Sequence, residues 1–236
     1  MSRLHREQAL SNGAEPSPLA PGATPDPGVA PGHATAAIGP NAVLQLIQAM
    51  DSQVGPSTTD ALLKECDLTR YRDQPPEGLI EEQTVIAVYQ TLRRRHAAED
   101  VEALSAEAGR RTAAYLLEHR IPAPAAALLR ILPAPLSARA LLRAIAAHAW
   151  TFAGSSAFEH VGGPRPRVSL LDSPLCRERP LEAPGCTFYL ATFEALFRAL
   201  VHRNTRARTL ECRATGGARC SFELSWSPAR HGSGSR

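Results

Sequence analysis

The sequence predicts an α+β fold in which N-terminal helices precede a short antiparallel sheet that ends in a C-terminal β-hairpin. In the first two thirds of the 236 residues, apolar side chains recur at helical spacing. Beyond Gly154 the pattern changes to short apolar runs separated by Gly and Pro turns, which is typical of strands. Hydrophobic residues make up 44% of the chain, enough to bury a core.

Both ends of the chain differ in composition from the middle. Within residues 1–37, 18 positions are Pro, Gly or Ala, and none is aromatic. Such a stretch cannot bury enough apolar surface to offset the entropy lost on ordering, so it predicts a disordered tail. Residues 227–236 predict a second tail. We therefore expect one folded domain over residues 38–226, with a helical N-terminal extension at 38–95 and a core at 96–226.

Six helices are expected in succession before Gly154. The first follows Pro40 and Asn41, and the longest ends before Pro122, because proline cannot continue a helix. The last is rich in Ala and is expected to run without a break to about Phe152. The expected spans are 41–50, 57–66, 81–95, 98–119, 125–132 and 137–152.

The strands and one further helix are expected after Gly154. Short strands at 157–161 and 168–171 flank a Gly-Gly-Pro turn, and a strongly amphipathic helix rich in aromatic residues follows at 186–202. The chain then predicts a β-hairpin, with strands at 206–214 and 219–226 joined by a turn that contains Gly216 and Gly217.

Four of the five cysteines lie in this C-terminal part. Side chains alternate along a strand, so Leu210, Cys212 and Cys220 are expected on one face of the hairpin, with Cys212 opposite Cys220. Cys186 begins the aromatic helix, whose N-terminus favours a thiolate, and Cys176 lies in the loop before it. Thiolates this close together can hold a zinc ion. The spacing alone leaves open that they are ordinary buried thiols or an oxidised pair.

Composition and motifs exclude several classes of protein. The longest uncharged apolar stretch, 144–158, is shorter than the ~20 residues of a membrane span, so we expect no transmembrane segment. Residues 1–13 lack an apolar run, so we expect no secretory signal. A net charge of +3 without a helix-turn-helix signature argues against nucleic-acid binding. No GxGxxG follows a strand, so the sequence shows no NAD(P) or flavin motif.

Three segments together resemble one protein family. They are Cys186-x25-Cys212-x7-Cys220 with LECRATGGARCSFEL at its end, AHAWTFAGSSAFEHV before the aromatic helix, and IGPNAVLQLIQAM near the start. The cysteine hairpin resembles the 4-vinyl reductase domain family, and the N-terminal segment resembles its bacteriochlorophyll-biosynthesis branch. The resemblance covers about residues 38–226. It implies a fold similar to the ligand-binding domains of aromatic-compound sensors and to vesicle-tethering subunits.

The resemblance also implies a closed structural zinc site. Relatives among phenol-type sensors bind zinc through three cysteines and a glutamate, and Cys186, Cys212 and Cys220 match the three cysteines by spacing. The position of the glutamate holds Thr209 in this chain. Cys176 is therefore the candidate to replace it as the fourth ligand.

From the resemblance we expect a protein of bacteriochlorophyll biosynthesis that binds a Mg-porphyrin or protochlorophyllide and assists vinyl reduction or Mg-porphyrin handling as a carrier. Its pocket is expected between the 137–152 helix, the 186–202 helix and the sheet, where a neutral His could ligate the central metal. Core packing also explains the aromatic residues that recur at helical spacing. The residues expected to line the pocket are His148, Trp150, Phe152, Phe158, His160, Phe188 and Phe193.

Two other functions stay open at this point. The family name implies a genuine vinyl reductase acting on divinyl protochlorophyllide, but the sequence shows no site for a reductant and assigns no catalytic residue. A scaffold for pathway enzymes is the third hypothesis. The expected partners are the tetrapyrrole, Mg-chelatase or other pathway enzymes, and a second copy of the chain in a homodimer. The expected location is the bacterial cytoplasm, with peripheral attachment to the photosynthetic membrane as an option.

Overall fold

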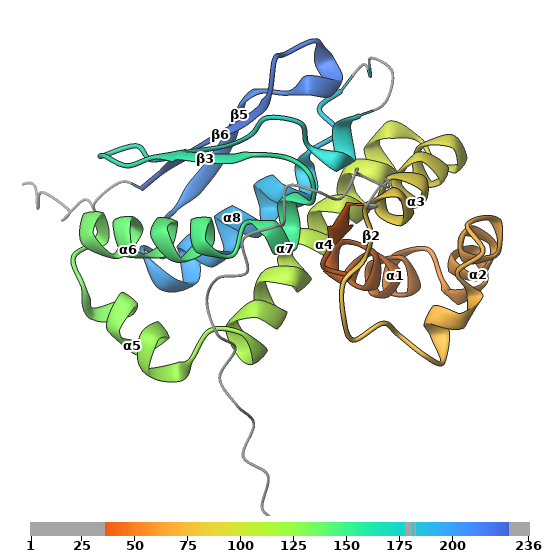
Figure 1. Ribbon diagram of the computed structural model, residues 1–236, viewed down its shortest axis with the longest axis horizontal. Helices are drawn as coiled ribbons and strands as arrows, with labels where there is room; N and C mark the ends of the chain where they lie inside the picture. Colours follow the sequence, from red (N-terminus) through yellow and green to blue (C-terminus); the bar gives the residue numbers. More distant parts are fainter. Residues whose placement is uncertain (1–35, 178–180, 182, 227–236) are drawn as a thin grey trace, which may run out of the picture. The chain divides into compact units, whose positions relative to one another are not determined.

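Helices come first along the chain and the main sheet comes last, which confirms the predicted α+β class (Figure 1). The computed structural model describes residues 36–177, 181 and 183–226. All of these lie within one unit of the chain, Thr35–Arg236. The tails predicted at 1–35 and 227–236 lie outside the described residues.

The predicted helices are present, with small shifts at their ends. Prolines open three of them, as expected at a first turn, where the missing N–H would have no partner within the helix. Single 3₁₀ turns lie between some of the longer elements. The helices are α1 (Asn41–Gln53), α2 (Pro56–Glu65), α3 (Glu82–Arg95), α4 (Ala98–His119), α5 (Ala123–Ile131), α6 (Ala134–Ala147), α7 (Trp150–Ala153) and α8 (Thr187–Leu200), with 3₁₀ turns η1 (Thr69–Arg72), η2 (Pro174–Cys176) and η3 (Arg213–Thr215).

The expected continuous helix over 137–152 is wrong, because the chain turns at His148 and divides it into α6 and α7. The N–H of His148 bonds to the carbonyl oxygen of Ile145, three residues back, and that of Ala149 bonds to Ala146 in the same way. This tighter turn ends the α-helical pattern. As a result Phe152 contacts the core, while Trp150 stays exposed.

A small sheet that the sequence did not predict ties the start of the described chain to α3. Strand β1 (Ala37–Ile38) pairs antiparallel with β2 (Ile80–Glu81), so Ala37, assigned above to the tail, is part of a strand. Two-residue strands are too short to show alternation. Their pairing depends on a contact between segments more than forty residues apart, which the folded structure alone reveals.

The main sheet is antiparallel, with strand order β3-β4-β6-β5. Its strands are β3 (Phe158–Val161), β4 (Arg167–Leu170), β5 (Arg206–Glu211) and β6 (Cys220–Ser225). Helix α8 lies against one face of the sheet, and α4 packs on α8 (Figure 1). The β6 side chains Cys220, Phe222 and Leu224, which follow the strand's period of two, are completely buried.

A β-bulge at Leu210 corrects the predicted register of the hairpin. Thr209 pairs with Phe222, and Glu211 pairs with Ser221, so one extra residue lies between them. Leu210 is therefore exposed instead of facing the core, as was expected. The extra residue also restores Cys212 to the inner side, where it is buried. The expectation for Cys212 was correct, but it depends on a bulge that strict alternation would have missed.

Helices α4 and α8 approach closely at Gly109. A Cβ atom at this position would collide with the carbonyl oxygen of Phe188, and the carbonyl oxygen of Gly109 accepts a hydrogen bond from the Thr192 hydroxyl at 3.1 Å. This contact fixes the start of α8, which carries Cys186 as its N-cap residue. Within the described part of the chain, no helix has the length and apolar character needed to cross a membrane.

Candidate metal centre and aromatic cluster

The four cysteines singled out from the sequence converge at one end of the sheet. Cys176 ends η2, Cys186 is the N-cap of α8, Cys212 follows β5, and Cys220 begins β6. All four are buried, and their sulfur atoms lie within 4.8 Å of one another. Three separate segments of the chain therefore meet at this cluster.

The separations between the sulfur atoms fit a tetrahedral metal site. The Sγ atom of Cys212 lies 3.4 Å from that of Cys186, 3.8 Å from that of Cys176 and 3.9 Å from that of Cys220. Zinc bound tetrahedrally by sulfur at ~2.3 Å places its ligand atoms about 3.8 Å apart. A disulfide needs ~2.05 Å, and all the cysteines of the described residues are free thiols. The donor set and its spacing thus fit a closed zinc site.

The thiols of the cluster influence one another electrostatically. Hydrogen bonds from Cys176 and Cys186 lower the pKa of the Cys212 thiol, which makes it the preferred thiolate of the group. The pKa of Cys186 is raised, because its thiol donates hydrogen bonds to its neighbours and is buried. A cation at the centre would favour the thiolate form of every ligand.

Glutamate does not complete the cluster. Glu211 is the nearest candidate in sequence, but its carboxylate accepts a hydrogen bond from the N–H of Ala218 at 2.6 Å, across the turn of the hairpin. Thr209, at the position where the resembled sensors have glutamate, lies within β5 opposite Phe222. Cys176 occupies the fourth corner instead.

Arg93 holds two of the cysteine-bearing segments together, and the sequence analysis did not identify it. This side chain, from the last turn of α3, donates to the carbonyl oxygen of Leu175 at 2.5 Å and to that of Gly185 at 3.4 Å. Leu175 and Gly185 directly precede Cys176 and Cys186. A side chain at Gly185 would crowd both the Arg93 guanidinium and the sulfur of Cys176. Sequence reasoning assigned the Arg93-Arg94-Arg95 run to the helix end alone.

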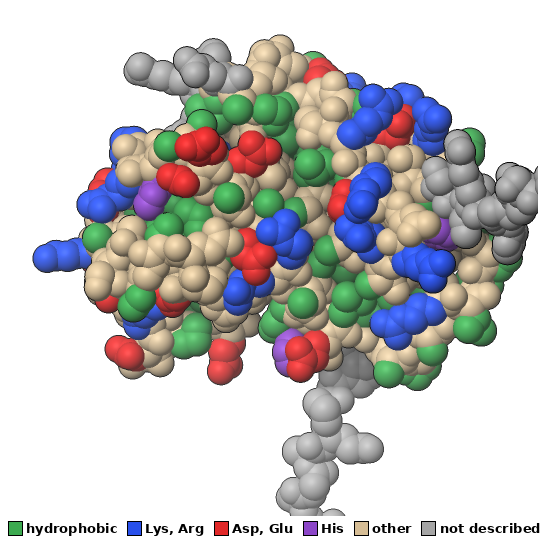
Figure 2. Space-filling view, turned by 180° about the vertical axis from the view of Figure 1, so that it is seen from behind, with side chains coloured by type: hydrophobic (Ala, Val, Ile, Leu, Met, Phe, Trp, Pro, Cys, Tyr) green, Lys and Arg blue, Asp and Glu red, His purple; other side chains and the backbone are tan. Residues whose placement is uncertain are grey.

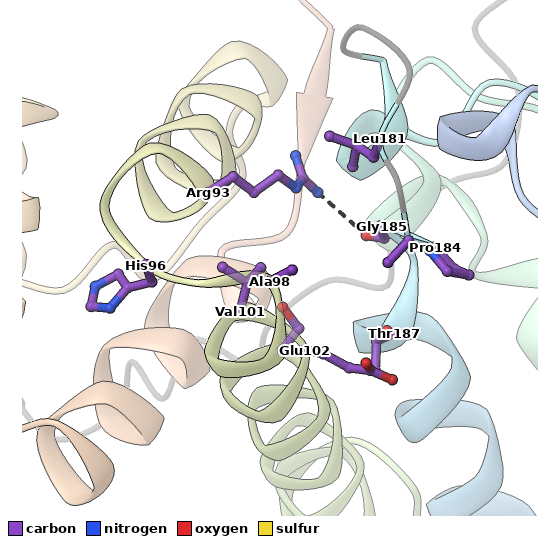
Figure 3. A pocket seen from close by; sticks show the side chains of 11 residues that line it. Arg93, His96, Ala98, Val101, Glu102, Leu181, Pro184, Gly185 and Thr187 are labelled. Carbon is purple, nitrogen blue, oxygen red and sulfur yellow. Dashed lines mark hydrogen bonds between the residues drawn. The ribbon is translucent and has the colours of Figure 1, made fainter.

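A small cavity lies beside this arginine, with a volume of about 200 Å³. Figure 3 shows Arg93 reaching across it toward Gly185, with α4 below and the start of α8 opposite. Its polar lining comes from Arg93, His96, Glu102 and Thr187. Ligand pockets for drug-sized molecules measure ~300–1,000 Å³, so this cavity is too small for a tetrapyrrole. It also lies away from the predicted position between α6, α8 and the sheet.

Five of the seven predicted pocket residues join one aromatic cluster. Phe152 is central: its ring centroid lies 5.4 Å from that of Phe158, 6.1 Å from that of Phe193 and 6.4 Å from that of Tyr189. The cluster extends to His160 through Phe158 and to Phe188 through Tyr189. Tyr189 and Phe222 belong to it although they were not predicted. The cluster links α7, β3, β6 and α8.

The other two predicted residues lie outside the cluster. His148 is exposed at the end of α6, and its Nδ1 is 2.9 Å from the carbonyl oxygen of Ala144 in its own helix. Trp150 is exposed at the start of α7. The turn that divides the predicted helix at His148 directs these two side chains away from Phe152, so the helical spacing that grouped them was misleading.

Comparison with known proteins supports the cysteine hairpin as a domain signature. The family model of the 4-vinyl reductase (4VR) domain matches residues 166–225, which contain β4, α8 and the hairpin. Two relatives, both named bacteriochlorophyll synthase 23 kDa chain, match most of the chain. The one from Cereibacter sphaeroides is 39% identical over 79% of this chain and 89% of its own. The one from Rhodobacter capsulatus is 38% identical over 79% of this chain and 86% of its own.

Solved structures resemble the fold at low sequence identity. An unliganded Fe(II) H-NOX protein mutant from K. algicida superposes with a TM-score of 0.55 at 12% identity, covering 82% of this chain and 98% of that one. A second H-NOX structure, from a study of heme distortion, gives a TM-score of 0.53 at 12% identity, covering 79% and 94%. The phenol-responsive sensory domain of the transcription activator PoxR matches at 0.47 and 14% identity, covering 62% and 75%. At these identities the likeness shows the fold alone.

Proposed function

This chain belongs to the family of the bacteriochlorophyll synthase 23 kDa chain, and on that basis we propose that it binds a Mg-tetrapyrrole intermediate of bacteriochlorophyll biosynthesis and carries it between enzymes of the pathway. The observation that carries the proposal is the 39% identity over 79% of the chain with a relative named for this synthase. The fold supports it, because an H-NOX structure of the same fold is described in terms of its heme, which is also a tetrapyrrole.

The aromatic cluster around Phe152 is the proposed binding region. Aromatic faces suit a flat, apolar macrocycle, and a few polar groups at the edge of such a pocket would fix its orientation. Phe158 and Phe152 are only partly buried, so the cluster reaches the surface between α7 and β3. His160 lies next to Phe158 with 6.3 Å between ring centroids, and its imidazole is the available ligand for a central magnesium.

We also propose that Cys176, Cys186, Cys212 and Cys220 hold a structural zinc ion. All four corners are protein ligands, which leaves no position for water or substrate, so the role is to stabilise the fold. Purified protein is expected to contain one zinc per chain, and Cys212→Ser is expected to lose it together with several kcal/mol of stability. Cys66→Ser is the matched control, because Cys66 is a cysteine outside the cluster. Protein containing no zinc, yet as stable as the zinc-loaded form, would contradict this proposal.

The test of pigment binding is a titration of the full chain with divinyl protochlorophyllide, followed by absorbance and fluorescence. Saturable binding at micromolar pigment with a shifted Soret band is expected. His160→Ala is expected to weaken binding and alter the band, while His119→Ala, an exposed histidine at the end of α4, should leave both unchanged. Absence of saturable binding by folded, zinc-loaded protein would overturn the proposal.

The same cuvette separates a carrier from an enzyme. A carrier returns the pigment with its vinyl group intact after NADPH or reduced ferredoxin is added, whereas a vinyl reductase converts it with a change in the absorption spectrum. A second candidate is favoured by the name of the relatives, which describes one chain of a synthase. In that case the protein would act as a subunit, and co-purification with pathway enzymes in the absence of pigment would support it.

A further inference from the structure

The α5–α6 hairpin presents large apolar side chains to solvent. Ile131 is 80% exposed, Leu136 is 55% exposed and Leu128 is 54% exposed. Of the nine residues of α5, only Ala126 is buried, although eight of the nine are apolar. Isolated exposed apolar residues are ordinary, but a nearly all-apolar helix with one buried residue is a candidate interaction surface.

The outer side of α6 continues this surface. Its buried residues are Ser137, Ala138, Leu141 and Leu142. A helical period of 3.6 therefore directs Leu136, Ala140 and Ala147 outward, next to Arg139 and Arg143 on the same side. Both arginines are exposed, and neither forms a salt bridge with any residue that the structure describes. We call Leu128, Ile131, Leu136, Arg130, Arg139 and Arg143 the α5–α6 surface.

The charge of this region has a single sign. Residues 119–158 contain four arginines and no Asp or Glu, whereas the whole chain has 23 acidic residues. Figure 2, seen from behind, shows hydrophobic and basic side chains without acidic ones toward the lower right, the side on which α5 and α6 lie. Elsewhere arginines are typically paired with carboxylates, as Arg72 is with Asp51 and Asp60.

We propose that the α5–α6 surface docks the protein onto a membrane whose lipid headgroups are anionic. Exposed Leu and Ile side chains can insert at the boundary between headgroups and acyl chains, while arginines beside them contact lipid phosphates. A protein partner of matching shape would need acidic groups to pair the arginines. A second copy of this surface would instead place like charges together, which is unfavourable. Charge complementarity therefore selects the anionic bilayer as the occupant.

The test is sedimentation of the full chain with vesicles of phosphatidylcholine alone and of phosphatidylcholine with phosphatidylglycerol. Binding is expected only to the vesicles that contain phosphatidylglycerol, and it should weaken as salt is added, because exposed charges are screened. Arg139→Gln/Arg143→Gln is expected to lower the partition coefficient by about tenfold or more. Leu128→Ser/Ile131→Ser is expected to lower it further by removing the inserted side chains.

Two control variants match these changes elsewhere on the molecule. Lys64→Gln/Arg70→Gln removes the same charge from exposed positions at the α2–η1 end, and Leu79→Ser removes an exposed leucine. Both should bind vesicles like the unaltered protein. Equal loss in the charge control would show a general charge effect and overturn the proposal. Absence of vesicle binding, or dimers in solution that Ile131→Ser dissociates, would overturn it in favour of a protein partner or a second copy.

Discussion

Arg93 shows how a residue outside the cysteine cluster controls its geometry. Its guanidinium joins the carbonyl groups of Leu175 and Gly185, which precede two of the four cysteines. It also brings a positive charge near a site that would be doubly negative with four thiolates around zinc. The N-terminal helices therefore take part in the metal centre, although all four ligands lie in the C-terminal half.

Replacing Arg93 with glutamine is expected to loosen the cluster without removing a ligand. Hydrogen bonds from a charged donor contribute ~1.5–3 kcal/mol, so we expect a loss of stability of that order and faster release of zinc to a chelator. Arg94→Gln is the matched control, because Arg94 is exposed and pairs with Glu65 at the surface, where such pairs contribute ~0–1 kcal/mol. Equal rates of zinc release from the two variants would show that Arg93 does not position the cysteines.

Glu223 predicts a measurable pH dependence. This β6 carboxylate is buried on the sheet face away from α8, and its hydrogen bond from Arg208 holds its pKa below the ordinary value of 4.5. A lowered pKa stabilises the folded state above the unfolded pKa, and this stabilisation is lost as the pH falls through the folded pKa. Glu223→Gln should therefore be less stable than the unaltered protein at neutral pH, with the difference shrinking below pH 4.5.

The measurement for Glu223 is urea unfolding at a series of pH values. The informative quantity is the difference in unfolding free energy between Glu223→Gln and the unaltered protein. A difference that stays constant from neutral to acid pH would mean that the ion pair with Arg208 does not cause the loss.

At the scale of elements, the contact between α4 and α8 connects packing to the metal centre. Gly109 lets the backbone of α8 approach at Phe188, two residues after Cys186. The α5–α6 hairpin, by contrast, leaves most of its apolar residues exposed. The two helix pairs thus differ in role: the first positions a ligand residue, and the second presents a surface.

Gly109→Ala is expected to destabilise the protein. Alanine normally favours a helix by up to ~1 kcal/mol over glycine, but here the added methyl group meets a backbone carbonyl that cannot move freely. Overpacking of this kind costs ~1–3 kcal/mol, and the displaced start of α8 should also weaken zinc binding. Gly78→Ala is the control, because nothing lies within 4 Å of a Cβ at that position. Thermal unfolding and zinc content measure both effects; a Gly109→Ala protein as stable as the control would contradict the argument.

At the scale of the whole molecule, a buried ion pair joins the N-terminal helices to the sheet region. Glu82, at the start of α3, accepts a hydrogen bond from Arg177 at 2.6 Å and from the N–H of Ser155 at 2.9 Å. Arg177 also lies 2.9 Å from a carboxylate oxygen of Asp172, which in turn is 3.2 Å from Arg213 beside the hairpin turn. Segments from three parts of the sequence depend on this network.

Breaking this pair on one side should cost more than removing both charges. Arg177→Met leaves the buried carboxylate of Glu82 without its cation, for which ~3–5 kcal/mol is typical. Glu82→Gln/Arg177→Met removes the uncompensated charge, so it is expected to be clearly more stable than Arg177→Met alone. Urea unfolding of the two single variants and the double variant gives the coupling energy. Additive losses would show that the two groups act independently.

The sequence by itself determined the class of the fold, the helices and the hairpin, and it identified all four cysteines of the cluster. These features depend on local patterns: apolar spacing for α1 to α4 and α8, glycine turns for the strands, and cysteine spacing for the candidate metal centre. Residues 178–180 and 182, in the loop between Cys176 and Cys186, lie outside the described residues.

Only the tertiary structure decided the features that depend on contacts between distant segments. The turn at His148, the bulge at Leu210 and the β1–β2 pair each follow from packing against elements remote in sequence. Arg93 acquires its role because α3 lies beside the cysteine loops, and its own sequence context shows only a basic helix end. Periodicity records which face a side chain prefers, but the partner that covers that face is set by how the whole chain packs.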